Sequence, residues 1–162
     1  MNLGNAFPPE YLRKQIEQCL VPGAVLYLEV RFPEVTKNKF LVLVATPNDG
    51  DDDCFNFIVN SAVNPYITHR QELSVCQVTM DVANHDFLAY DSHIACNEIL
   101  SISKREIVGA LMNDFGRYKG KISVDVKDNI LAAVKHAVTL DKIQKREIIA
   151  GLEAQYPLDF DH

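Results

Sequence analysis

The sequence lacks the features that mark several classes of protein. It has no run of the roughly 18 apolar residues that a membrane-spanning helix needs. Its first residues contain no apolar stretch of the kind found in signal peptides. It has no internal repeat and no low-complexity segment. These absences predict a cytoplasmic protein with no membrane partner.

Paired metal ligands are missing as well. The cysteines are few and scattered without a C-x-x-C pair: Cys19, Cys54, Cys76 and Cys96. Four cysteines could form two disulfides, but a chain of 162 residues can build a core without them, so we expect buried reduced thiols. The histidines lack the close i,i+4 spacing of a helical zinc-binding pair: His69, His85 and His93.

The acidic run at residues 49–53 invites a calcium interpretation. Its alternate aspartates match the first three ligand positions of an EF-hand loop. Cys54 stands where that loop needs glycine, however, and Asn60 where it needs glutamate. A solvated hairpin tip is the better interpretation, and we expect neither a metal nor a cofactor.

An excess of positive charge is also absent. The chain has 16 Lys and Arg against 22 Asp and Glu, for a net charge of −6 and a pI of about 5.3. This balance argues against a protein coated with positive charge to hold duplex DNA. The hydrophobic content of 48% and the length predict one ordinary globular domain spanning residues 1–162.

Hydrophobic periodicity divides this domain into four parts. Helical spacing follows Pro8 and Pro9 and predicts an N-terminal helix within residues 1–21. Period-two and apolar segments between residues 22 and 103 predict six short strands, at 24–31, 39–45, 54–63, 72–80, 86–94 and 97–103. Two to three helices are expected in residues 104–155, followed by a tail at 156–162. The fold class is therefore mainly β with α, built on a compact antiparallel barrel or sandwich.

Two serines mark the starts of the later helices. Ser103 and Glu106 have the spacing of a capping box, and Ser123 precedes an apolar stripe of helical period. A last helix is predicted from about Thr139.

Cationic residues gather around two predicted loops. They are Arg31, Lys37, Lys39, His69 and Arg70. If both loops open on the same end of a barrel, they form a positive cleft in which single-stranded RNA could stack its bases on Phe32 and Tyr66. Five cations can also gather by chance, and composition alone leaves both interpretations open.

Several segments, taken in order, resemble the MazF/PemK toxins. These are "PGAVLYLEV", "KFLVLVA", "FIVNSA", "YDSHIACNEILSISKREI" and "KGKISVDVKDNILAAVKHAV", which together cover roughly residues 22–138. The resemblance implies an SH3-like antiparallel barrel, a homodimer and a metal-independent endoribonuclease that an antitoxin neutralises. Such an enzyme cuts single-stranded RNA by attack of the 2′-hydroxyl on the adjacent phosphate.

The resemblance also implies the catalytic residues. Lys39 stands at the position of the family's arginine, and Ser61 at the position of its threonine or serine. Arg31, Lys37, Tyr66, His69 and Arg70 are the expected substrate-binding residues. Lysine keeps the charge of arginine but loses its bidentate grip on phosphate. A barrel that has lost catalysis and binds a protein segment in the same cleft is therefore the alternative hypothesis.

The triplet Asp91-Ser92-His93 looks like a source of catalytic groups. Neighbours on a strand point to opposite faces, however, so these three side chains cannot form a triad together. In the resembling family they match a strand that leads to a helix, and we predict a structural role.

Overall fold

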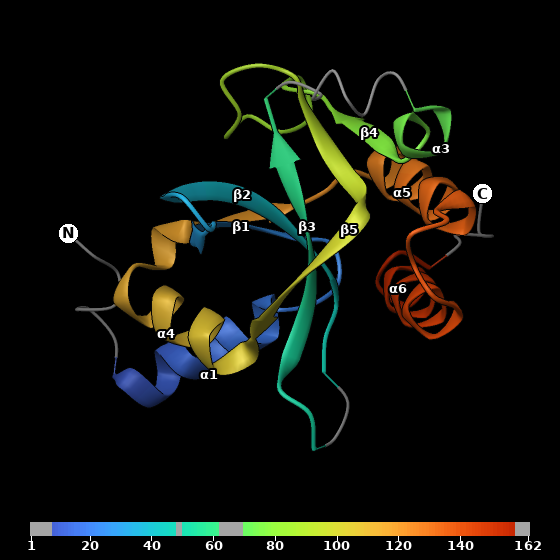
Figure 1. Ribbon diagram of the computed structural model, residues 1–162. Coiled ribbons are helices and arrows are strands. Elements are labelled where there is room, and N and C mark those ends of the chain that lie inside the picture. Colours follow the sequence, from blue (N-terminus) through green and yellow to red (C-terminus); the bar gives the residue numbers. More distant parts are fainter. Residues whose placement is uncertain (1–7, 48–49, 62–69, 158–162) are drawn as a thin grey trace, which may run out of the picture.

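Figure 1 shows a computed structural model of the chain, which describes residues 8–47, 50–61 and 70–157. Its centre is a six-stranded antiparallel sheet, curled into a half-barrel, with the strand order β4-β5-β3-β2-β1-β6. The strands are β1 Ala24–Arg31, β2 Thr36–Ala45, β3 Asp53–Asn60, β4 Gln77–Met80, β5 Ser92–Ser103 and β6 Tyr118–Lys121. The prediction of an antiparallel sheet with an N-terminal helix and later helices is confirmed at this level.

Helices cover both faces of the sheet (Figure 1). They are α1 Pro9–Cys19, α3 Gln71–Ser74, α4 Lys104–Asn113, α5 Val124–His136 and α6 Lys142–Gln155, with a short 3-10 turn at Phe115–Arg117. Helices α1 and α4 pack on one face, where Leu26, Leu41 and Ile107 are fully buried. Helices α5 and α6 pack on the other, over Val42 and Phe57. We call these the α1/α4 face and the α5/α6 face. No helix of the described residues is long and apolar enough to cross a membrane.

The predicted N-caps at Ser103 and Ser123 are present, but Glu106 does not return the bond that would complete the capping box expected at Ser103. The hydroxyl of Ser103 accepts a hydrogen bond from the Glu106 backbone N–H at 3.1 Å, and that of Ser123 accepts one from Val126 N–H at 3.3 Å. The last helix begins later than predicted, because Asp141 and Gln144 form a reciprocal capping box there.

The strand assignments need three corrections. The predicted strands at 86–94 and 97–103 are one bent strand, Ser92–Ser103, whose register with β3 shifts between Asn56 and Ile58. Residues 86–91 form turns, and the start of the predicted strand at 72–80 is the short helix Gln71–Ser74. Strand β6 follows α4 and was not predicted, because its four residues carry too little pattern to be recognised.

A seam at Gly23 joins the end of α6 to the sheet. Gly23 has φ of +100°, and its C=O accepts a hydrogen bond from Ile122 N–H at 2.9 Å. The Tyr156 hydroxyl donates to the Ile122 carbonyl at 2.8 Å. A Cβ on Gly23 would lie 2.5 Å from the Tyr156 hydroxyl oxygen, so only glycine fits beneath that ring.

Candidate functional site

Lys39 and Asn60 meet on the α1/α4 face, beyond the part of the sheet that the two helices cover. Lys39 lies opposite Leu28 of β1, and its Nζ donates a hydrogen bond to Asn60 Oδ1 at 2.8 Å. Both side chains are half-buried. Burial lowers the pKa of Lys39 from its ordinary value, and the nearby charge of Lys37 lowers it further.

A hollow of about 390 Å³ adjoins this pair. Phe32, Lys37, Lys39 and Asn60 line it, together with the turn between β1 and β2, which contributes the carboxylate of Glu34. The Lys37 ammonium lies 5.7 Å from the centre of the Phe32 ring. Two cations beside an aromatic ring suit an anionic group that carries a flat ring, as a nucleotide does.

The other predicted site residues are spread more widely. Ser61 is exposed and directly follows Asn60 at the end of β3. Arg31 lies at the end of β1 and lines a different hollow of about 440 Å³, beside Glu106 and Arg117. Arg70 is exposed and immediately precedes α3.

Within the predicted set, the structure therefore brings Lys37 and Lys39 together in one hollow and places Arg31 in another. Arg70 leads into β4, which is separated from β2 by two strands. Tyr66 and His69 lie outside the described residues.

Asn60 was missed by sequence reasoning, which selected its neighbour Ser61. The alternation of β3 contains the missing signal. Ile58 packs against the α1/α4 core, so Asn60, two residues later, shares that face with Lys39. Recognising this requires the register between β2 and β3, which local patterns do not fix.

Two more polar residues extend the pair across the sheet. Asn60 of β3 is paired with His93 of β5, and His93 is paired with Thr79 of β4. Direct partners on antiparallel strands have side chains on the same face. Lys39, Asn60, His93 and Thr79 thus form one line across four adjacent strands, which we call the polar row.

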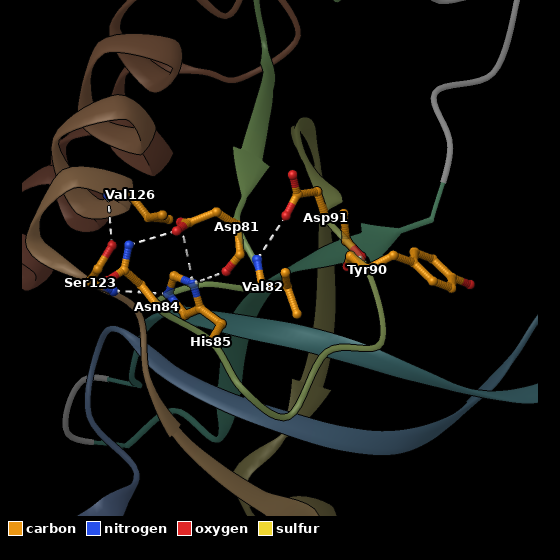
Figure 2. Close-up of polar contacts among 9 residues, drawn as sticks. Asp81, Val82, Asn84, His85, Tyr90, Asp91, Ser123 and Val126 are labelled. Atoms are coloured by element: carbon orange, nitrogen blue, oxygen red, sulfur yellow. Dashed lines mark hydrogen bonds and ion pairs between the residues drawn. The ribbon is translucent and has the colours of Figure 1, made fainter.

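The segment before His93 is a separate hydrogen-bonded network (Figure 2). His85 is buried, with its Nδ1 2.8 Å from the Asp81 carbonyl oxygen, and its Nε2 accepts a hydrogen bond from Ser123 N–H at 3.1 Å. These partners require a proton on Nδ1 and none on Nε2. His85 therefore ties the turn after β4 to the start of α5.

Asp81 has its own partners in this network. Desolvation alone would raise the pKa of its carboxyl, but a hydrogen bond from Asn84 and the other polar contacts outweigh it and lower the pKa. The Asn84 amide lies 2.6 Å from Asp81 Oδ2.

Asp91 and Ser92 also hold the backbone of this segment. Asp91 accepts a hydrogen bond from Val82 N–H at 2.8 Å, and the Ser92 hydroxyl donates to the Tyr90 carbonyl at 3.1 Å. These bonds fit the structural role predicted for both residues. His93, in contrast, stands on the open polar row.

No model of a known protein family matches the chain, and no curated protein matches it. The chemistry of the Lys39 hollow and of the polar row is therefore the basis for assigning a function. Among residues 8–47, 50–61 and 70–157, no cluster of three or more His, Cys, Asp or Glu could hold a metal ion.

Proposed function

We propose that the protein is an endoribonuclease toxin that binds single-stranded RNA at the Lys39 hollow and cleaves it by attack of a 2′-hydroxyl on the adjacent phosphate. The observation that carries the proposal is the pairing of Lys39 with Asn60 beside Phe32 and Lys37. It supplies fixed positive charge and an aromatic surface within one hollow.

The chemistry requires stabilisation of a crowded, negatively charged phosphorane. Lys39 is positioned by Asn60, so its ammonium does not need to reorganise as that charge develops. A lysine binds phosphate as a point charge, whereas an arginine binds it through a planar fork. Lys37 adds a second point charge from the same strand, and an RNA base would stack near Phe32.

The resemblance to the MazF/PemK toxins supports a fuller form of the proposal. In that form the half-barrel is a variant of the SH3-like barrel, and the chain acts as a homodimer that an antitoxin holds inactive. Light scattering tests the assembly, since a monomer at micromolar concentration would contradict the dimer. Co-expression with the product of the neighbouring reading frame tests the antitoxin.

Cleavage itself is tested with purified protein and a broad pool of single-stranded RNA, without added metal. We expect products that end in 2′,3′-cyclic phosphates. Lys39→Ala should lower kcat/KM by about 10²–10³-fold, the scale for losing one donor that stabilises an oxyanion. Lys14→Ala is the matched control, because Lys14 is an exposed lysine on α1.

A second candidate function is favoured by the environment of Lys39. Its ammonium already has a partner in Asn60 and a lowered pKa. It would therefore suit a carboxylate of a docked protein segment as well as a phosphate. If the wild type and Lys39→Ala are equally inert on the RNA pool, the chain is a binding module and not a ribonuclease.

A further inference from the structure

Cleavage by a 2′-hydroxyl needs a group that accepts a proton, and neither Lys39 nor its partner Asn60 supplies one. A protonated lysine stabilises negative charge but cannot accept a proton. An asparagine amide neither accepts a proton nor gives one up. The Ser61 hydroxyl is a poor base at neutral pH. The one carboxylate that lines the hollow, Glu34, is exposed in the turn between β1 and β2, so the other candidate base is a group on the strands beside Asn60.

The sheet register brings one imidazole next to this hollow. His93 is the direct cross-strand partner of Asn60, and such partners have Cβ atoms about 4.5–5.5 Å apart. Asn60 in turn holds the Lys39 ammonium at 2.8 Å. The imidazole, the amide and the ammonium thus follow one another across β5, β3 and β2, and all three side chains are half-buried.

The two other described histidines lack this placement. Both ring nitrogens of His85 are occupied by backbone groups in the buried network. His136 is exposed near the end of α5, which packs on the opposite face of the sheet. The ring of His93 has no hydrogen bond to any of the described residues, so a nitrogen remains available to a ligand.

We infer that His93 is the general base of the reaction, an inference that rests on the proposed ribonuclease function. His93 takes the proton of the 2′-hydroxyl while that oxygen forms its bond to phosphorus. The bond between phosphorus and the 5′-oxygen breaks, and the departing oxygen takes a proton from water. His93 then returns its proton to solvent, leaving a 2′,3′-cyclic phosphate and a 5′-hydroxyl.

The test is the pH dependence of kcat for the wild type, His93→Gln and the control His136→Gln. For the wild type we expect kcat to rise with pH, because only a neutral imidazole can accept the proton of the 2′-hydroxyl. His93→Gln should lose this rise and about 10²–10⁴-fold of kcat, the usual contribution of a general base. His136→Gln should behave as the wild type.

Binding is measured separately with a 2′-deoxy oligonucleotide, which cannot be cleaved. His93→Gln should keep its Kd within about twofold, because the base acts in the transition state and not in ground-state binding. Urea unfolding of His93→Gln, with His93→Asn as a second variant, checks that any loss of rate is not a loss of fold.

The outcomes separate this inference from the function it rests on. If the wild type cleaves, Lys39→Ala is slow and His93→Gln keeps both rate and pH profile, His93 is not the base and the ribonuclease stands. If His93→Gln loses oligonucleotide binding along with its rate, it has a binding role and the inference is overturned. If the wild type cuts no RNA, the inference and the proposed function both fail.

Discussion

The two histidines of one short segment have opposite environments. His85 is buried beside α5, with one ring nitrogen bound to Asp81 and the other to Ser123. His93 is half-buried on the α1/α4 face, in line with Asn60 and Lys39. The same residue type thus uses both ring nitrogens in buried hydrogen bonds at one position and has no hydrogen-bond partner among the described residues at the other.

The two environments show which polar groups remain available to a ligand. A buried polar group must find partners within the protein, and those partners consume its donors and acceptors. A group at the uncovered end of a sheet keeps its hydrogen-bonding capacity for a ligand. The number of hydrogen-bond partners within the protein, more than the residue type, therefore distinguishes the His85 network from the polar row.

The largest effect is expected from His85→Ala. Loss of the ring leaves Ser123 N–H and the Asp81 carbonyl without their partners and creates a cavity under α5. We expect the free energy of unfolding to fall by about 2–4 kcal/mol. His93→Ala is the matched comparison and should cost less than about 1 kcal/mol. If urea denaturation gave the same loss of unfolding free energy for both variants, the two histidines would not differ in their structural roles.

A smaller effect is expected when the pH is raised, because the polar row should then bind an oligonucleotide less tightly. Because burial and Lys37 lower the pKa of Lys39, its charge is lost as pH rises, and earlier than that of an ordinary lysine. Affinity for a 2′-deoxy oligonucleotide should therefore fall as the pH is raised above neutral, and should begin to fall before the range in which an ordinary lysine loses its charge. Lys39→Arg keeps its charge over this range and should show a flatter profile in fluorescence anisotropy. Identical profiles would exclude Lys39 as the titrating group.

An effect of intermediate size on stability is expected from the helix cap of α5, which lies beside the His85 network. Ser123→Ala removes the acceptor for Val126 N–H, which should cost about 1 kcal/mol. Ser123→Asp restores an acceptor and should recover most of that loss in thermal unfolding. If Asp fails to do so, the Ser123 hydroxyl has some role other than capping the helix.

The smallest effect on stability is expected from Lys39→Met. The lowered pKa means that the folded chain binds this proton less tightly than the unfolded chain does, so at neutral pH the buried charge costs stability. The ammonium remains partly solvated, and its hydrogen bond to Asn60 is lost with it, so the free energy of unfolding should change by no more than about 0.5 kcal/mol. RNA cleavage should nevertheless be lost. A large destabilisation would mean that Lys39 holds the fold together.

Features fixed by a few adjacent residues could be predicted from the sequence. The caps at Ser103 and Ser123 involve atoms three residues apart, and both were found. The period of two in β1 and the apolar runs in β2 and β3 identified these strands, each of which has eight or more residues. The turns at residues 86–91 escaped because Asp91 is bound to Val82, a partner that local composition does not reveal.

The candidate site was only half predictable for the same reason. Lys37 and Lys39 lie on one strand and could be selected by charge. Asn60 and His93 join them only through the registers of β2 with β3 and of β3 with β5. A shift of one residue in either register would turn these side chains to the opposite face. The sequence led to Ser61, whereas the register places its neighbour Asn60 beside Lys39.

The seam at Gly23 also constrains the order in which a newly made chain can finish folding. Gly23 bonds to Ile122, and Tyr156 then covers both through its hydroxyl and ring. The first strand of the described chain is therefore fully covered only after Tyr156, which is synthesised much later, has taken its place. Until that residue emerges, the edge of β1 beside Gly23 lacks its final cover, and this is the surface on which a nascent chain would need protection from aggregation.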